Sequence, residues 1–241
     1  MHLAGKPMLQ HLIDTVDTFP KAKTSIVVGY KFKEVIGGVA SQKKLNFFKQ
    51  TKPLGTAHAV KQAFPALRAN SISIVLYGDV PSVTKNTLIK LLNKASQGKL
   101  SLLTFKKEDP TGYGRIIRGS RSTVERIVEH KDATNKEREI EEVNSGILAI
   151  KTTDLKRLLP KIKNKNASKE YYLTDLIEIA QGESIDVSAT VCSEYEVGGA
   201  NNKKELHDLE RAYQKRNAEN LLTKGVSIAD TSRIDIRGNA Q

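Results

Sequence analysis

The chain has 241 residues, enough for one large domain or two small ones, and its 39% hydrophobic and 27% charged content is ordinary for a soluble globular protein. Its net charge of +12 suits nucleic-acid binding, an enzyme that handles nucleotides and phosphorylated sugars, or only a solvated lysine-rich surface. Single-strand binding by base stacking is disfavoured because only 5% of the residues are aromatic, and the basic residues are scattered. The single Cys192 excludes an internal disulfide, and no segment has the form of a membrane span or a signal peptide, so we expect a cytoplasmic protein.

Helices and strands are predicted to alternate in the first part of the chain. Apolar residues recur at three- and four-residue spacing in the helical segments, and glycines stop the strand-like runs. The predicted helices are 7–16, 31–39, 55–64 and 86–95, and the predicted strands are 25–28, 45–49, 72–77 and 100–105. The run 72–77 is almost entirely apolar, as in a strand covered on both faces. This alternation predicts an α/β fold with a mostly parallel sheet.

The middle of the chain is predicted to contain more β-structure. A loop dense in turn-forming residues, 109–114, leads into it. The predicted strands are 115–117, 124–128, 143–150 and 185–191, and the predicted helices are 154–162, 172–180 and 202–223. Gly225 marks the end of the last helix. The apolar residues within 226–238 then resemble the opening of another β-structure.

Two positions in the first part have local patterns typical of ligand sites. Asp79 follows a predicted buried strand, and ligands of open α/β sheets bind beyond the carboxyl ends of the strands. Its carboxylate suits Mg²⁺, although a turn residue is the alternative. Gly55 and Thr56 open a helix whose free N–H groups suit anions or polar ligand atoms, unless Thr56 is an ordinary helix cap.

Further candidates lie in the β-rich middle. The loop 109–114 either lets backbone approach a ligand or only turns a hairpin. Glu129 and Asn144 lie at or within strand-like runs, where each either binds hydroxyl groups or faces solvent. No catalytic triad, HExxH motif or paired-cysteine motif is present, and His58 receives no role.

Six motifs occur in the order of one known family. They are LAGKPM at 3–8, LGTAHA at 54–59, LYGDVP at 76–81, DPTGYGR at 109–115, IVEHKDA at 127–133 and EYYLTD at 170–175. On these motifs the chain resembles the bifunctional N-acetylglucosamine-1-phosphate uridyltransferase/glucosamine-1-phosphate acetyltransferase family, along essentially its whole length. The order of all six is far more specific than any one motif.

The resemblance implies both a fold and a reaction. The fold is that of nucleotide-diphospho-sugar transferases, a Rossmann-like mixed α/β sheet, here lacking its first strand. It implies a uridyltransferase domain over 1–201, a linker helix over 202–225, and the start of a left-handed β-helix over 226–241. The reaction joins UTP and N-acetylglucosamine 1-phosphate into UDP-N-acetylglucosamine and pyrophosphate, for peptidoglycan and lipopolysaccharide synthesis.

The resemblance also implies a set of site residues and a Mg²⁺ cofactor. Gln50, Gly55 and Thr56 would hold the uracil, and Tyr77 and Gly78 would line the nucleotide. The sugar would be held by Gly114, Glu129 and Asn144. Asp79 and Asn201 would bind Mg²⁺, with Asn201 also reaching the substrate.

Three features differ from the family pattern. The family's first strand and phosphate-binding loop would precede His2 and are absent from the sequence, so we expect exposed apolar strand faces and unpaired strand edges. Residues 197–201 read VGGAN where the family usually has VEGVN. The β-helix that carries acetyl transfer and trimer contacts is also absent, so neither acetyl transfer nor a homotrimer is expected.

Two alternatives stay open at this point. Without the phosphate-binding loop, the chain could be a catalytically inactive fragment of such an enzyme. The net charge of +12 alone leaves a basic nucleic-acid-binding protein as a remote alternative, although no recognised binding motif accompanies the charge.

Overall fold

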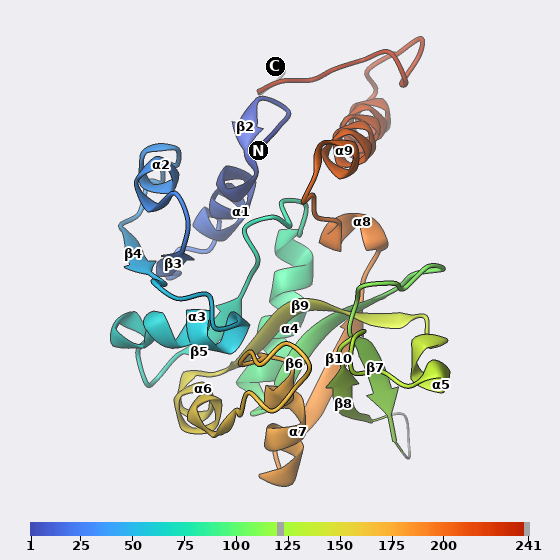
Figure 1. The fold of residues 1–241 in the computed structure, drawn as a ribbon. Coiled ribbons are helices and arrows are strands. Elements are labelled where there is room, and N and C mark those ends of the chain that lie inside the picture. Colours follow the sequence, from blue (N-terminus) through green and yellow to red (C-terminus); the bar gives the residue numbers. More distant parts are fainter. Residues whose placement is uncertain (120–122, 239–241) are drawn as a thin grey trace.

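A six-stranded mixed sheet forms the centre of the molecule (Figure 1). The computed structural model describes residues 1–119 and 123–238. In sheet order the strands are β10 (Val187–Val191), β6 (Leu100–Lys106), β9 (Glu142–Lys151), β7 (Arg115–Arg118) and β8 (Val124–Val128), and β5 (Ile72–Val75) pairs with the end of β9.

The strand directions correct one prediction and confirm another. β10 runs parallel to β6, but β9 runs antiparallel to both β6 and β5. The prediction of a mostly parallel sheet is therefore wrong, and the mixed sheet is confirmed. A parallel neighbour needs a crossover of a dozen or more residues, usually helical. The connections that lead to β7, β8 and β9 contain only the short helix α5 (Asn135–Arg138) among the described residues.

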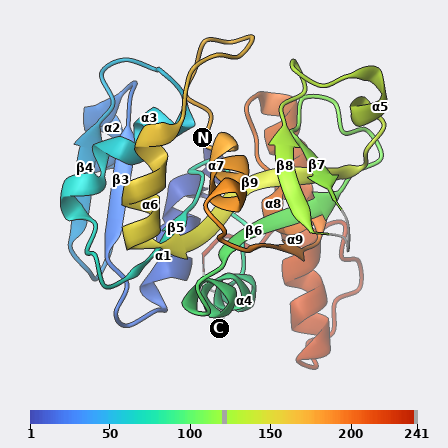
Figure 2. The same cartoon turned by 90° about the horizontal axis from the view of Figure 1, so that it is seen from below.

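Helices cover both faces of this sheet (Figure 2). Helix α4 (Lys85–Ser96) lies on one face, and α6 (Thr152–Leu158) and α7 (Asp175–Gly182) lie on the other. Along β6, Leu100 and Leu102 belong to the core under α6 and α7, whereas Leu103 and Phe105 belong to the core under α4. The strand is therefore buried on both faces, and its polar residues Ser101 and Thr104 are buried together with its apolar ones.

A second, two-stranded parallel sheet lies beside the first. It consists of β3 (Thr24–Val28) and β4 (Leu45–Lys49), with α1 (Met8–Asp17), α2 (Phe32–Gly37) and α3 (Thr56–Gln62) around it. Among the described residues β3 pairs only with β4, and β5 only with β9. Both strands thus have an unpaired edge, as predicted, whereas Ile72 and Ile74 of β5 are half-buried against the core under α4 rather than exposed.

Short elements complete the chain. They are β1 (His2–Leu3), β2 (Lys6–Pro7), the 3₁₀ helices η1 (Phe64–Ala66) and η3 (Leu159–Lys161), α8 (Glu194–Val197) and the long α9 (Lys203–Thr223). None of the helices in the described parts of the chain has the length and apolarity needed to cross a bilayer.

The tail after α9 runs back along that helix. Ile236 N donates to Gln214 Oε1 (2.7 Å), and Gln214 Nε2 donates to Ile236 O (3.1 Å). In the described tail, residues 224–238 form neither helix nor strand. The β-helix start over 226–241 stays a prediction, and its last three residues, 239–241, lie outside the described residues.

Candidate functional site

The side chain of Gln50 lies at the end of β4, next to the first turn of α3. Gln50 N donates to Val28 O (2.9 Å), which extends the β3–β4 ladder by one residue. Its side-chain Nε2 donates to Gly55 O (3.1 Å) and lies 2.9 Å from His58 Nδ1. The structure thus joins two predicted uracil-binding residues to a histidine that had no predicted role.

Segment 171–174, just before α7, packs on the start of α3. A Cβ on Gly55 would lie 2.6 Å from Tyr171 O, and Gly55 has a φ of +106°, so only glycine fits there. Leu173 N donates to Thr56 Oγ1 (3.0 Å). The hydroxyl and backbone that open α3 are therefore fixed by a segment far away in the sequence.

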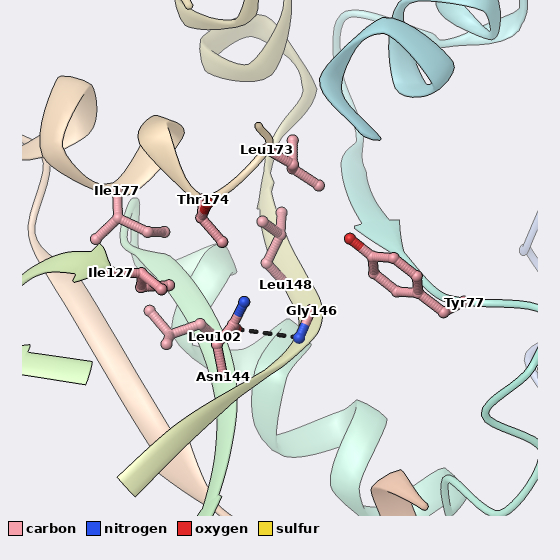
Figure 3. A pocket seen from close by; sticks show the side chains of 9 residues that line it. All are labelled: Tyr77, Leu102, Ile127, Asn144, Gly146, Leu148, Leu173, Thr174 and Ile177. Atoms are coloured by element: carbon pink, nitrogen blue, oxygen red, sulfur yellow. Dashed lines mark hydrogen bonds between the residues drawn. The ribbon is translucent and has the colours of Figure 1, made fainter. Parts of the chain in front are cut away.

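A pocket lies between the residues that follow β5, the middle of β9 and the start of α7 (Figure 3). It is mostly apolar and is lined by Tyr77, Leu102, Ile127, Asn144, Gly146, Leu148, Leu173, Thr174 and Ile177. Tyr77 lies across it from Asn144 and Thr174 (Figure 3). The cavity volume is about 10 Å³, roughly the space for one water molecule, so only a small group could enter it without side-chain movement.

The phenol of Tyr77 is kept protonated. Its pKa is raised to about 12, mainly by burial. The hydrogen bond with Thr56 lowers the pKa, and the carboxylates of Glu129 and Asp79 raise it further. A Cβ on Gly146 would lie 2.5 Å from Tyr77 Cε2, so this glycine allows β9 to approach the ring. At neutral pH the phenol can therefore donate a hydrogen bond beside the pocket.

The three predicted sugar-binding residues are contiguous in the structure. Thr174 Oγ1 donates to Glu129 Oε1 (2.9 Å), and burial raises the pKa of Glu129 above its usual value. A Cβ on Gly114 would lie 3.4 Å from Glu129 Oε2. Gly114 O accepts from Asn144 N (2.8 Å). Gly114 thus contacts both the Glu129 carboxylate and the Asn144 backbone, while the Asn144 carboxamide lines the pocket and its Oδ1 accepts from Gly146 N (3.0 Å).

Asp175, the first residue of α7, lies among other carboxylates. Burial raises the pKa of Asp175 to about 6, and the charges of Glu178, Glu129 and Asp132 raise it in the same direction. A carboxylate at a helix N-terminus is usually stabilised by about 0.3–1 kcal/mol, which is smaller than a shift of about two pKa units. The ionised form of Asp175 therefore destabilises the fold.

We expect Asp175→Asn to stabilise the protein in a pH-dependent way. The folded-state pKa is raised, so the wild type loses stability as pH rises from about 4 to about 6. The asparagine avoids this loss, and the gain should reach about 1–2 kcal/mol above pH 6 after solvent screening and vanish near pH 4. Urea unfolding at pH 4, 5, 6 and 7 measures it, and a gain that does not change with pH would contradict the explanation.

Glu183→Gln is the opposite control. Hydrogen bonds from Lys161 and Arg157 lower the pKa of Glu183. A lowered folded-state pKa means that the ionised form stabilises the fold above the unfolded pKa. The glutamine should therefore lose stability at neutral pH, where Asp175→Asn gains it.

The segment before α9 packs against the backbone at Asp79. A Cβ on Gly199 would lie 3.0 Å from Asp79 O, which is tighter than ordinary van der Waals contact. Asn201 follows two residues later, is exposed, and its N donates to Glu205 Oε2 (2.7 Å). The chain segments that carry the two predicted metal ligands are therefore neighbours.

The chemistry of this pair suits a magnesium ion. Among the described residues, no group of three or more His, Cys, Asp or Glu side chains could hold a metal. Asp79 and Asn201 offer oxygen atoms, which Mg²⁺ prefers, and Mg²⁺ usually takes only one or two protein ligands beside water and phosphate. The pair fits an ion that is bound largely through a nucleotide.

Arg115 was not predicted as a site residue, yet it fixes the loop 109–114. Its buried guanidinium donates to Tyr113 O and to Arg138 O (3.3 Å from Nη2), and Nη2 lies 3.2 Å from His130 Nδ1. An arginine in a strand-like run gives no sequence signal of burial. The guanidinium of Arg115 holds the loop that ends at Gly114, because it bonds to the backbone oxygen of Tyr113 within that loop.

Comparison with known proteins agrees with this geometry. The model of the nucleotidyl transferase family matches residues 1–194. The bifunctional protein GlmU of Chromohalobacter salexigens is 44% identical over 240 residues, which is 99% of this chain and 52% of that protein. The chain therefore spans about half the length of the curated relatives that it matches.

Solved structures share the fold. A nucleoside-diphosphate-sugar pyrophosphorylase from Vibrio cholerae superposes with a TM-score of 0.66 at 13% identity, over 88% of this chain and 90% of that one. A UDP-glucose pyrophosphorylase superposes with a TM-score of 0.67 at 16% identity, over 90% of each chain. These similarities confirm the predicted nucleotide-sugar transferase fold.

Proposed function

Because this chain belongs to the nucleotidyl transferase family, we propose that it joins UTP and N-acetylglucosamine 1-phosphate into UDP-N-acetylglucosamine and releases pyrophosphate. The likeness of its six motifs to the uridyltransferase family supports this choice of substrates. As part of the same proposal, the reaction takes place in the cytoplasm and supplies precursors of peptidoglycan and lipopolysaccharide.

One observation carries the proposal: segment 171–174 connects the two halves of the site. Tyr171 covers Gly55 at the start of α3, and Leu173 N donates to Thr56 Oγ1. One residue later, Thr174 Oγ1 donates to Glu129. A nucleotide sugar has a base at one end and a sugar at the other, and this segment reaches both predicted subsites.

The proposed contacts follow from this arrangement. Gln50, Gly55 and Thr56 bind the uracil, and Tyr77 and Gly78 line the nucleotide. Gly114, Glu129 and Asn144 bind the sugar hydroxyl groups. Burial raises the pKa of Glu129 and raises that of Tyr77 to about 12, so both side chains lie where water solvates them poorly. Hydrogen bonds from these two side chains to a ligand are stronger there than they would be in water.

The reaction itself requires positioning more than covalent chemistry. A phosphate oxygen of the sugar phosphate attacks the α-phosphorus of UTP, a new P–O bond forms, and the bond to the leaving pyrophosphate breaks in line with it. Residues that hold the base and the sugar fix the two reacting groups at the required distance. The residues around Tyr77 and Asn144 serve this orienting role, since the pocket between them has room for only a small group of the ligand.

Asp79 and Asn201 are the residues that would hold Mg²⁺. When bound, Mg²⁺ supplies neutralisation of the phosphate charge. The contact between Gly199 and the Asp79 backbone supports this pairing, because it brings the segment that carries Asn201 to the end of β5.

A pyrophosphate-release assay with UTP, N-acetylglucosamine 1-phosphate and Mg²⁺ tests the proposed function. We expect release that requires both substrates and stops when EDTA removes the metal. Release with glucose 1-phosphate but not with N-acetylglucosamine 1-phosphate would contradict the proposed sugar. The absence of release with any sugar phosphate, from a chain shown to be folded, would contradict catalysis by this chain.

We expect Gly199→Ala to weaken catalysis without unfolding the protein. Its Cβ would lie 3.0 Å from Asp79 O, so the segment must move by a few tenths of an ångström, and Asn201 moves with it. Misplacement on this scale should lower kcat/KM by about tenfold and raise the Mg²⁺ concentration needed for half-maximal rate.

Gly198→Ala is the matched control for that variant. A Cβ on Gly198 would have its nearest neighbour at 3.6 Å, which is ordinary van der Waals contact. We expect this variant to keep the wild-type rate and Mg²⁺ dependence. Equal losses in both variants would show that the contact with Asp79 has no special importance.

A further inference from the structure

The orientation of the Gln50 amide can be assigned from its partners. A carbonyl oxygen only accepts hydrogen bonds, so the Gln50 atom 3.1 Å from Gly55 O must be the donor Nε2. The same Nε2 lies 2.9 Å from His58 Nδ1. Both hydrogens of the amide are then in use. Within residues 1–119 and 123–238 no protein group bonds Gln50 Oε1, so this acceptor is the atom that remains for a ligand.

The imidazole of His58 faces two glutamine side chains. Gln50 Nε2 lies 2.9 Å from Nδ1, and Gln62 Nε2 lies 3.2 Å from Nε2. A neutral imidazole has a lone pair on only one ring nitrogen, so it accepts from only one of the two. The contact with Gln50 is the shorter one, and the Gln50 amide is already held by Gly55 O. Gln62 Nε2 also donates to His58 O (3.1 Å), so the Gln62 amide keeps this backbone partner when the ring nitrogen beside it carries the hydrogen.

Resting on the proposed function, we propose that His58 is a positioning residue that fixes the Gln50 amide so that the site binds uracil and rejects cytosine. Uracil has a hydrogen on N3 and can donate it to Gln50 Oε1. Cytosine has a lone pair on N3, which would face the lone pairs of the same oxygen. A site built to accept a hydrogen bond discriminates strongly against a ligand that lacks the donor.

His58 matters because the amide could otherwise reverse. Turning the amide by 180° would place Nε2 toward the base, where it could donate to cytosine N3. In the wild type this rotation loses two hydrogen bonds, to Gly55 O and to His58 Nδ1. Without the imidazole it loses only one, so the preference for uracil falls.

The test compares the dissociation constants of UTP and CTP by isothermal titration calorimetry on the full chain. We expect the wild type to prefer UTP and His58→Leu to reduce that preference by about tenfold, which corresponds to one lost hydrogen bond. His58→Asn should restore most of it, because Asn Oδ1 can accept where Nδ1 did. In a Gln50→Ala background, His58→Leu should change nothing further.

Gln62→Ala is the matched control and separates the two tautomers. Removing Gln62 should leave the UTP preference intact, since the lone pair of His58 is assigned to Gln50. A ¹⁵N NMR spectrum of the wild type should show His58 protonated on Nε2 and unprotonated on Nδ1. This spectrum tests which ring nitrogen of His58 accepts from Gln50, and it needs only the wild type, so it does not depend on whether His58→Leu folds.

Each contrary result has a distinct meaning. A folded wild type that binds UTP and CTP equally would overturn the proposed function and, with it, this role. A wild type that prefers UTP, together with an unchanged preference in His58→Leu or no restoration by His58→Asn, would overturn the positioning role alone. Protonation on Nδ1, or a loss of preference in Gln62→Ala, would do the same.

Discussion

We expect Asp79→Asn to lower kcat/KM for pyrophosphate release by about 10³-fold. Asp79 follows β5 at the edge of the sheet, and the Gly199 segment packs on its backbone. Its carboxylate is the proposed negatively charged ligand of Mg²⁺, and the asparagine keeps the shape but loses the charge. The loss should be partly recovered at high Mg²⁺ concentration, because the ion would still be held by the nucleotide phosphates.

Two controls make this result specific. Asp154→Asn changes a carboxylate on α6 that pairs with Arg157, away from the pocket, and should leave the rate unchanged. UTP binding measured without metal should be similar in the wild type and in Asp79→Asn. A variant that retains wild-type kcat/KM at low Mg²⁺ would contradict the role of Asp79.

Gly55→Ala should destabilise the protein by about 3–5 kcal/mol. The residue has a φ of +106°, which L side chains rarely adopt, and its Cβ would lie 2.6 Å from Tyr171 O and 2.7 Å from Tyr171 N. Both clashes are with backbone, so rotation of a side chain cannot relieve them. Segment 171–174 would have to separate from α3, which breaks the connection between the two halves of the site.

Gly112→Ala shows how much of that loss comes from the backbone angle alone. Gly112 has a φ of +85°, but a Cβ there would meet nothing within 4 Å. We expect a loss of about 1 kcal/mol. Urea unfolding of both variants gives the difference, and similar losses would show that the contact with Tyr171 contributes little.

Elements with a strong local pattern were predicted well. The strands 45–49 and 124–128 and the helix that begins near Met8 have the predicted limits within a residue or two, since periodicity and flanking turn residues specify them. Helix α7 begins at Asp175 rather than at 172. The reason is tertiary, because the backbone of Tyr171 bonds to Leu54 and Ala57 and Leu173 N bonds to Thr56 Oγ1, which holds this segment against α3 before α7 begins.

The strand directions and the site partners could not be obtained from local pattern. An apolar run such as 143–150 shows that a strand is buried but not whether its neighbours run parallel to it. Gly199 and Tyr171 also carry no local signal, because their importance comes from backbone that approaches them from distant segments. Gln50 and Asn201 were named from family resemblance alone, and local pattern gave His58 no role.

A crystal structure of the chain with Mn²⁺ and UDP-N-acetylglucosamine tests the central claim most directly, since the anomalous signal of manganese locates the ion. We predict one ion bound by oxygen atoms of both Asp79 and Asn201 at about 2.0–2.3 Å, with the diphosphate as a further ligand and the uracil against Gln50. An ion bound elsewhere, or a nucleotide sugar held without either side chain, would contradict it.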